Sequence, residues 1–178
     1  QGNQSTDHGG GMHLIEGSAP VLDACTVTQN SAGHYTFGMG IYCRASSPRL
    51  TDCRLIANSW ADYSAGGGLY CEEGSAPVLT RCEVPPNRLS CGAGAGLFCR
   101  DSTILVRECV LAENWVDHGE RGGAIFVVGS SQVRVESCAL VDNMPKPSFD
   151  AGIEPGGQIG VWAGSYDIVI ANNTIEGG

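Results

Sequence analysis

The sequence predicts an all-β protein, a right-handed parallel β-helix (solenoid) of about six coils with 28–29 residues per coil. A motif of that length recurs six times along the chain. Each copy consists of short runs in which apolar and polar residues alternate, bounded by Gly, Ser, Asn and Pro, as β-strands are. No window shows a sustained helical period. Because so short a strand cannot bury its apolar face alone, we expect the copies to stack about 4.8 Å apart.

The clearest copy runs from Gly66 to Asn87, GGGLYCEEGSAPVLTRCEVPPN, and its second cysteine is the best anchor for aligning the others. The anchor positions are spaced by 28, 29, 27, 29 and 35 residues. They are occupied by Cys25, Cys53, Cys82, Cys109, Cys138 and Asn173. Aliphatic residues three before and two after each anchor predict two inward-facing strand columns.

An asparagine follows each cysteine anchor by five residues, and Gly178 takes that place in the last copy. The column consists of Asn30, Asn58, Asn87, Asn114 and Asn143. A side-chain amide both donates and accepts hydrogen bonds, so stacked asparagines are expected to form a ladder at one corner of the coil.

The first strand of each copy begins with an aliphatic residue after a glycine or alanine, at Met12, Ile41, Leu69, Leu97, Ile125 and Val161. Two residues later a second inward column holds Leu14, Cys43, Cys71, Cys99, Val127 and Ala163. We therefore predict one β-helix domain over residues 1–178. Its coils cover roughly 9–37, 38–65, 66–93, 94–121, 122–157 and 158–178, with residues 1–8 as a preceding loop.

Eight of the nine cysteines fall in the two inward columns, and the ninth, Cys91, lies outside both. Stacked Cα atoms about 4.8 Å apart are within disulfide range, whereas identical rotamers in parallel rungs disfavour the disulfide torsion of about 90°. Two interpretations stay open: small buried thiols, or some disulfides between coils. No Cys-x-x-Cys spacing indicates zinc, and no resident metal is expected.

Ten basic and nineteen acidic residues give a net charge of −9, which disfavours nucleic acid as a partner. No run of 18 apolar residues occurs, so no membrane span is predicted. The chain begins at Gln1, which we interpret as a processed or excised piece. An extracellular or bacterial cell-surface location would suit the cysteine-rich composition.

Aromatic residues alternate with the inward residues of the first strand and are expected to face outward. The predicted contact surface consists of Tyr42, Tyr70, Phe98, Phe126 and Trp162, with His13 at the same position in the first copy. An exposed stripe of rings would bind a glycan, a host or cell-surface protein, or a neighbouring rod. Two alternatives are that a loop covers the rings, or that they belong to the core.

The loops that follow the asparagines form a second candidate site, with Asp62, Asp117, His118 and Arg121 as its residues. A polysaccharide lyase would need clustered acids for Ca²⁺ and a Lys or Arg base beside them. No cofactor is expected for the chain, and Ca²⁺ is the one that this enzyme alternative would require. The alternative is that these are solvated turn residues, without a catalytic role.

The pairing of GGGM, GGGL and GGAI with VTQN, LIAN, VPPN, LAEN and LVDN resembles repeats of bacterial surface proteins. These are right-handed β-helix proteins of the pectin-lyase-like superfamily, and the repeats are most similar to the passenger repeats of chlamydial polymorphic outer membrane proteins. The chain differs from those in having Cys, Val or Leu where they usually have Phe. The resemblance covers the whole chain and implies the fold more specifically than a function.

The leading hypothesis for function is a non-enzymatic, extracellular structural or adhesive repeat protein. Its two ends are in register, so either copies stack head to tail into a filament or the chain is part of a longer surface β-helix with flanking coils. The alternative is a carbohydrate-active enzyme, a polysaccharide lyase or glycoside hydrolase, or a carbohydrate-binding module that uses the loop edge.

Overall fold

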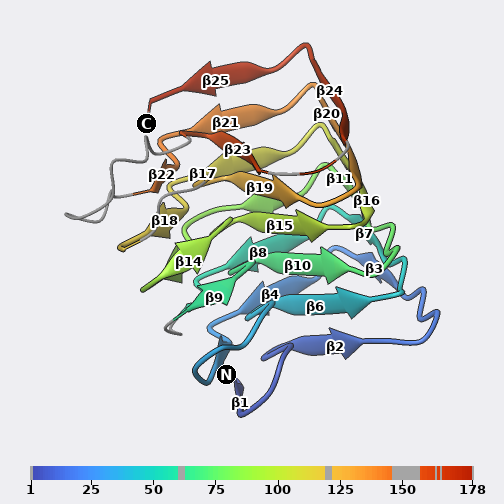
Figure 1. The fold of residues 1–178 in the computed structure, drawn as a ribbon, viewed down its shortest axis with the longest axis vertical. Coiled ribbons are helices and arrows are strands. Elements are labelled where there is room, and N and C mark those ends of the chain that lie inside the picture. The colour runs from blue at the N-terminus through green and yellow to red at the C-terminus, as the bar shows by residue number, and fades with distance from the viewer. Residues whose placement is uncertain are drawn as a thin grey trace.

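The computed structural model describes residues 2–59, 63–118, 122–145, 157–162, 164 and 166–177. Every regular element in this part of the chain is a β-strand, and all paired strands are parallel. The coils stack along the long axis of the molecule, with the N-terminus at the bottom of Figure 1 and the C-terminus at the top. The predicted parallel β-helix is thereby confirmed, with six rungs in each of three long sheets.

The three long sheets form the walls of the solenoid. The first contains β2 (Met12–Leu14), β6 (Ile41–Arg44), β10 (Leu69–Glu72), β15 (Leu97–Arg100), β19 (Ile125–Val128) and β23 (Ile159–Trp162). The second contains β3 (Val21–Asp23), β7 (Arg49–Thr51), β11 (Val78–Thr80), β16 (Thr103–Arg107), β20 (Ser131–Glu136) and β24 (Tyr166–Ala171). The third contains β4 (Thr26–Thr28), β8 (Arg54–Ile56), β12 (Glu83–Val84), β17 (Val110–Ala112), β21 (Ala139–Val141) and β25 (Thr174–Glu176).

Short strands in the loops after the asparagine corner form three smaller sheets. These pair β1 (Gln4–Ser5) with β5 (Ser31–Ala32), β9 (Ser64–Ala65) with β14 (Gly92–Ala93), and β18 (Trp115–Val116) with both β13 (Arg88–Leu89) and β22 (Met144–Pro145). They give the coil additional paired backbone outside the long sheets.

The core is a set of side-chain columns that run along the axis. Leu69 pairs with Ile41 below it and with Leu97 above it, and all three are fully buried. Cys43, Cys71 and Cys99 form the next column of the same sheet, also fully buried. One continuous cluster of this kind fills the interior between the three walls.

The register of the sixth rung differs from the sequence alignment by two residues. Ile159, and not Val161, pairs with Ile125, while Trp162 pairs with Val128 and Gly160 lies beside Phe126. The sixth copy carries extra residues between Asn143 and β23, so its period no longer fixes where the strand starts. A shift of two keeps each side chain on the same face of the sheet. Trp162 therefore stays on the outer face but lies outside the aromatic column.

Single residues with positive φ form the corner before the cysteine column in every coil and the corner before the asparagine column in most coils. Before the cysteine column these are Ala24, Asp52, Arg81, Glu108, Ser137 and Asn172, and before the asparagine column they include Gln29, Ala57, Glu113 and Asp142. L-residues pay for this left-handed conformation, so the stacking of neighbouring coils must hold it in place.

Candidate functional site

A ladder of buried amides marks the asparagine corner. The backbone N–H of Asn58 donates to Oδ1 of Asn87 at 3.0 Å, and the Asn58 amide group donates to the same oxygen at 3.2 Å. The same pair of bonds links Asn30, Asn58, Asn87, Asn114 and Asn143. Asn3 adds a rung below Asn30, and Gln158 closes the top by accepting from Asn143 and donating to the carbonyls of Glu176 and Gly177.

The cysteine corner repeats this geometry with sulfur. The backbone N–H of Cys82 donates to Sγ of Cys109 at 3.3 Å, and that of Cys109 donates to Sγ of Cys138 at 3.4 Å. Asn173 completes the column, since its Oδ1 accepts from the Cys138 N–H at 2.7 Å. All nine cysteines are free thiols, so neither the cysteine corner nor the strand column of Cys43, Cys71 and Cys99 contains a disulfide.

Hydrogen bonding to the Cys109 thiol lowers the pKa of Cys82 and of Cys138 to about 7, against the opposing effect of burial. The hydrogen bonds with Cys138 and Cys82 raise the pKa of Cys109. In the strand column, burial raises the pKa of Cys43 to about 12. Cys82 and Cys138 are therefore the more readily ionised thiols of the corner, and in the strand column a hydrogen bond with Cys71 likewise lowers the pKa of Cys99.

The third corner holds a serine ladder that the sequence reasoning missed. Ser46 N–H donates to Oγ of Ser75, and Ser75 N–H donates to Oγ of Ser102, both at 3.1 Å. The signal was present in the sequence, since Ser18, Ser46, Ser75, Ser102 and Ser131 follow one another at the same 28, 29, 27 and 29 residues as the cysteines.

The aromatic column faces away from the main core, as expected from strand alternation, but it does not form an exposed stripe. Tyr42, Tyr70, Phe98 and Phe126 are buried in a second apolar cluster with Ala65 and Ala93. The two alanines belong to β9 and β14, which cover the column. The expectation of an open contact face is thus wrong for these four rings, and the covering-loop alternative holds.

The buried rings are stacked and tied to one carboxylate. The centroids of Tyr70 and Phe98 are 4.8 Å apart, with a 12° angle between the ring planes. Glu72 accepts a hydrogen bond from the hydroxyl of Tyr70 at 3.0 Å and one from the hydroxyl of Tyr42. Burial and the neighbouring Glu72 carboxylate raise the pKa of both tyrosines, so their hydroxyls stay protonated donors.

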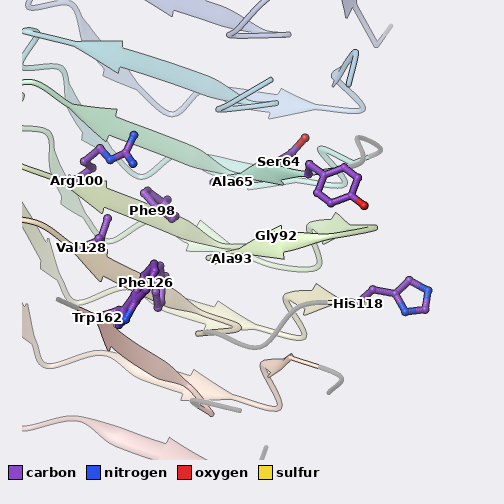
Figure 2. A pocket seen from close by; sticks show the side chains of 11 residues that line it. Ser64, Ala65, Gly92, Ala93, Phe98, Arg100, His118, Phe126, Val128 and Trp162 are labelled. Atoms are coloured by element: carbon purple, nitrogen blue, oxygen red, sulfur yellow. The ribbon is translucent and has the colours of Figure 1, made fainter. Parts of the chain in front are cut away.

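A groove of about 410 Å³ opens where the column meets the loop edge. Figure 2 shows the lining side chains of the first sheet on the left, with the residues of β9 and β14 to the right of them. The first-sheet residues are Phe98, Arg100, Phe126, Val128 and Trp162. Trp162 is 52% exposed, the most exposed ring among these residues of the first sheet. Tyr63 and His118 lie at the rim, so the groove combines an apolar floor with polar groups at its edges.

The structure does not bring the predicted loop-edge residues together in one site. His118 lines the groove, whereas Asp117 is held by two hydrogen bonds of 2.9 Å from Arg88 and one of 2.7 Å from the Trp115 ring. Asp62 and Arg121 lie outside the described residues. Among the residues that are described, no group of three or more His, Cys, Asp or Glu side chains is arranged to hold a metal ion. This part of the chain also contains no helix long and apolar enough to cross a membrane.

Comparison with known proteins identifies the architecture and leaves the ligand open. The family model described as "Right handed beta helix region" matches residues 1–175. Neither the curated proteins nor the solved structures include a match to this chain. The match therefore agrees with the fold and gives the sense of the coil as right-handed.

Proposed function

We propose, from the premise that the chain belongs to the right-handed β-helix family, that it is a non-enzymatic adhesive module that binds a glycan. It would act outside the cell or on its surface, in keeping with the resemblance of its repeats to bacterial surface proteins. The observation that carries the proposal is the groove with Trp162 in its floor.

Three properties of the groove favour a short saccharide over an extended protein surface. Its volume of about 410 Å³ lies within the range of small-molecule sites, roughly 300–1,000 Å³. Because its four rings are buried, the aromatic column does not offer a protein a long apolar stripe to cover. Trp162 offers an exposed ring on which the apolar face of a sugar stacks, while Arg100 and His118 offer hydrogen-bond donors for hydroxyl groups.

A glycan array probed with the labelled chain tests this function. We expect binding that Trp162→Ala reduces at least tenfold, because the ring supplies the stacking surface. Val110→Ala is the matched control, since Val110 is 44% exposed on β17, outside the groove. Equal binding by both variants, or no glycan bound by the parent chain, would reject the proposal.

End-to-end association is a second candidate, favoured by the apolar side chains at both ends. Ile170 and Ile175 continue the columns of Val135 and Leu140 but are 47% and 49% exposed. At the other end a hollow of about 330 Å³ is lined by Met12, Leu22 and Val27. A second copy placed on the C-terminal rung would set Leu22 and Val27 over the two isoleucines in the same columns.

A further inference from the structure

We propose that the cysteine corner is a binding site for a soft monovalent cation of the Cu(I) type, held in line between the thiolates of neighbouring coils. The column consists of Cys25, Cys53, Cys82, Cys109 and Cys138. Thiolates are the protein ligands that select Cu(I). This site is separate from the groove and is independent of the proposed function.

The spacing of the coils matches linear two-coordinate binding. Three corner thiols, Cys53, Cys82 and Cys138, have the same surroundings. Each contacts the carbonyl two residues before it and one carbonyl of the preceding coil, at 3.2–3.5 Å. Equivalent sulfurs in successive coils are therefore separated by about one rung, roughly 4.8 Å. Two metal–sulfur bonds of about 2.3 Å, the length found for zinc thiolates, span about 4.6 Å.

The corner already supplies donors for the negative charge. Binding of one cation M⁺ to two thiols gives an S–M–S group with one negative charge and releases two protons. Backbone N–H groups point at the sulfurs of Cys109 and Cys138, at 3.3 and 3.4 Å. Hydrogen bonds of this kind stabilise a buried anion, which would otherwise be costly.

Loss of the thiol protons leaves no carbonyl group unsatisfied. Each thiol now donates to the carbonyl two residues before it, as Cys82 does to Thr80 and Cys109 does to Arg107. The Thr80 carbonyl also accepts the backbone N–H of Asp52 at 3.1 Å, and the Arg107 carbonyl that of Arg81 at 3.0 Å. The metal can therefore replace the protons without breaking the backbone network of the corner.

The strand column of Cys43, Cys71 and Cys99 lacks this repetition. The Cys71 thiol contacts the carbonyl of Phe98 in the next coil, whereas the Cys99 thiol contacts that of Ser102 in its own coil. These two thiols also hydrogen-bond to each other, but their different carbonyl contacts mean that the geometry of one coil is not repeated in the next. The strand column therefore provides a matched comparison with equally buried thiols.

Two double variants distinguish the columns, each in a Cys91→Ser background. Cys53→Asn with Cys109→Asn leaves no two neighbouring thiols at the corner, because the remaining ones are two rungs, roughly 9.6 Å, apart. Asparagine fits there, as Asn173 accepts from the Cys138 N–H and donates to the Val135 carbonyl at 2.8 Å. Cys43→Val with Cys99→Val is the control, because Val127 continues that column.

The experiment is an anaerobic titration of the reduced, intact chain with Cu(I) against a chromogenic Cu(I) chelator. The parent and the strand-column variant are expected to bind equally tightly. The corner variant should lose more than the 10–100-fold typical of losing an outer-shell partner, because a ligand is removed. Equal affinity of the corner variant, loss of affinity in the strand-column variant, or no binding by the parent would overturn the proposal.

X-ray absorption on the copper-loaded parent decides the question even if a variant fails to fold. Two sulfur atoms in the first shell, together with protection of Cys53, Cys82 and Cys109 from alkylation in urea, are the expected result. A shell containing nitrogen or oxygen, or protection confined to Cys43, Cys71 and Cys99, would contradict the site.

Discussion

Single residues with positive φ decide where each coil bends. Ala57 has a φ of 54° immediately before the asparagine ladder and is exposed. A left-handed conformation costs an L-residue about 1–2 kcal/mol, a penalty that glycine avoids. The backbone at these positions is therefore strained, because the fold requires a positive φ that a non-glycine residue disfavours.

Ala57→Gly is expected to raise the free energy of unfolding by about 0.5–1 kcal/mol, the relieved strain less the greater chain entropy of glycine. Ala112→Gly, in β17 with no positive φ, is the control and should lower it by a similar amount. Urea unfolding measures both. A destabilised Ala57→Gly variant would show that the turn carries no strain.

Ion pairs between coils give the stability a dependence on pH. Hydrogen bonds from Arg107 and then Arg134 hold the pKa of the Glu136 carboxyl below its ordinary value. A pKa lower in the folded than in the unfolded state contributes stability above the unfolded pKa, about 4.3, and this contribution is lost as the pH falls through the folded pKa.

Arg107→Gln should therefore lower the urea midpoint above about pH 5, with the difference from the parent shrinking below about pH 4. The measurement is the urea midpoint at several pH values in low salt. Arg49→Gln, on the outer face of β7, is the control, and the account predicts no comparable pH-dependent difference for it. A difference for Arg107→Gln that stays constant between pH 3 and 7 would contradict the role of Glu136.

Among the elements, the stacked rings between β10, β15 and the short strands β9 and β14 form a second core outside the solenoid wall. Tyr70 is 1% exposed, and its hydroxyl shares the Glu72 carboxylate with Tyr42. The strands β9 and β14 pack on the aromatic column, and the groove is lined by residues of both.

Tyr70→Ala is expected to cost about 3–5 kcal/mol of folding stability, as for other large aromatic truncations. Tyr70→Phe keeps the ring and loses one hydrogen bond, so it should cost about 0.5–1.5 kcal/mol. Chemical denaturation compares the two variants. Similar losses for both would mean that the hydroxyl, and not ring packing, secures the column.

The residue spacing in the sequence predicted some of the side-chain columns and missed others. Regular spacing placed the asparagine, cysteine and aliphatic columns, because a ladder requires one residue per coil at a fixed interval. It would also have found the serine corner and Asn3, which lies 27 residues before Asn30. The place of Gln158 in the ladder could not be predicted from spacing, because Gln158 follows the extra residues of the sixth copy. It contacts Asn143 only in the folded chain.

Cover of the aromatic column was unpredictable for a different reason. Its cover comes from the two-residue strands Ser64–Ala65 and Gly92–Ala93, which are too short and too small to give a hydrophobic pattern. The alternation of side chains along a strand correctly predicted that the rings lie on the outer face of the sheet. It does not indicate which segment packs against that face. The groove is lined by one residue of the predicted aromatic surface, Trp162, and by one residue of the predicted loop-edge site, His118. The sequence alone placed these two residues in separate candidate sites.

At the scale of the whole molecule, the apolar side chains of the two end rungs predict association of the purified chain. Analytical ultracentrifugation should show a mass that rises with concentration. Ile170→Asp with Ile175→Asp should abolish that rise, because it places charge in the end columns. Val21→Asp, at an even more exposed apolar residue on the outer side of β3, is the control. A concentration-independent monomer for the parent chain would reject end-to-end stacking.

The proposed glycan site is the groove formed by the first sheet and the β9–β14 pair. The direct measurement is an amide NMR titration of the intact chain with the oligosaccharide that binds best on the array. We expect the signals of Ala65, Ala93 and Phe98 to shift, while those of Leu55 and Leu111 on the third sheet do not. Shifts confined to the third sheet, or none at saturating oligosaccharide, would contradict it.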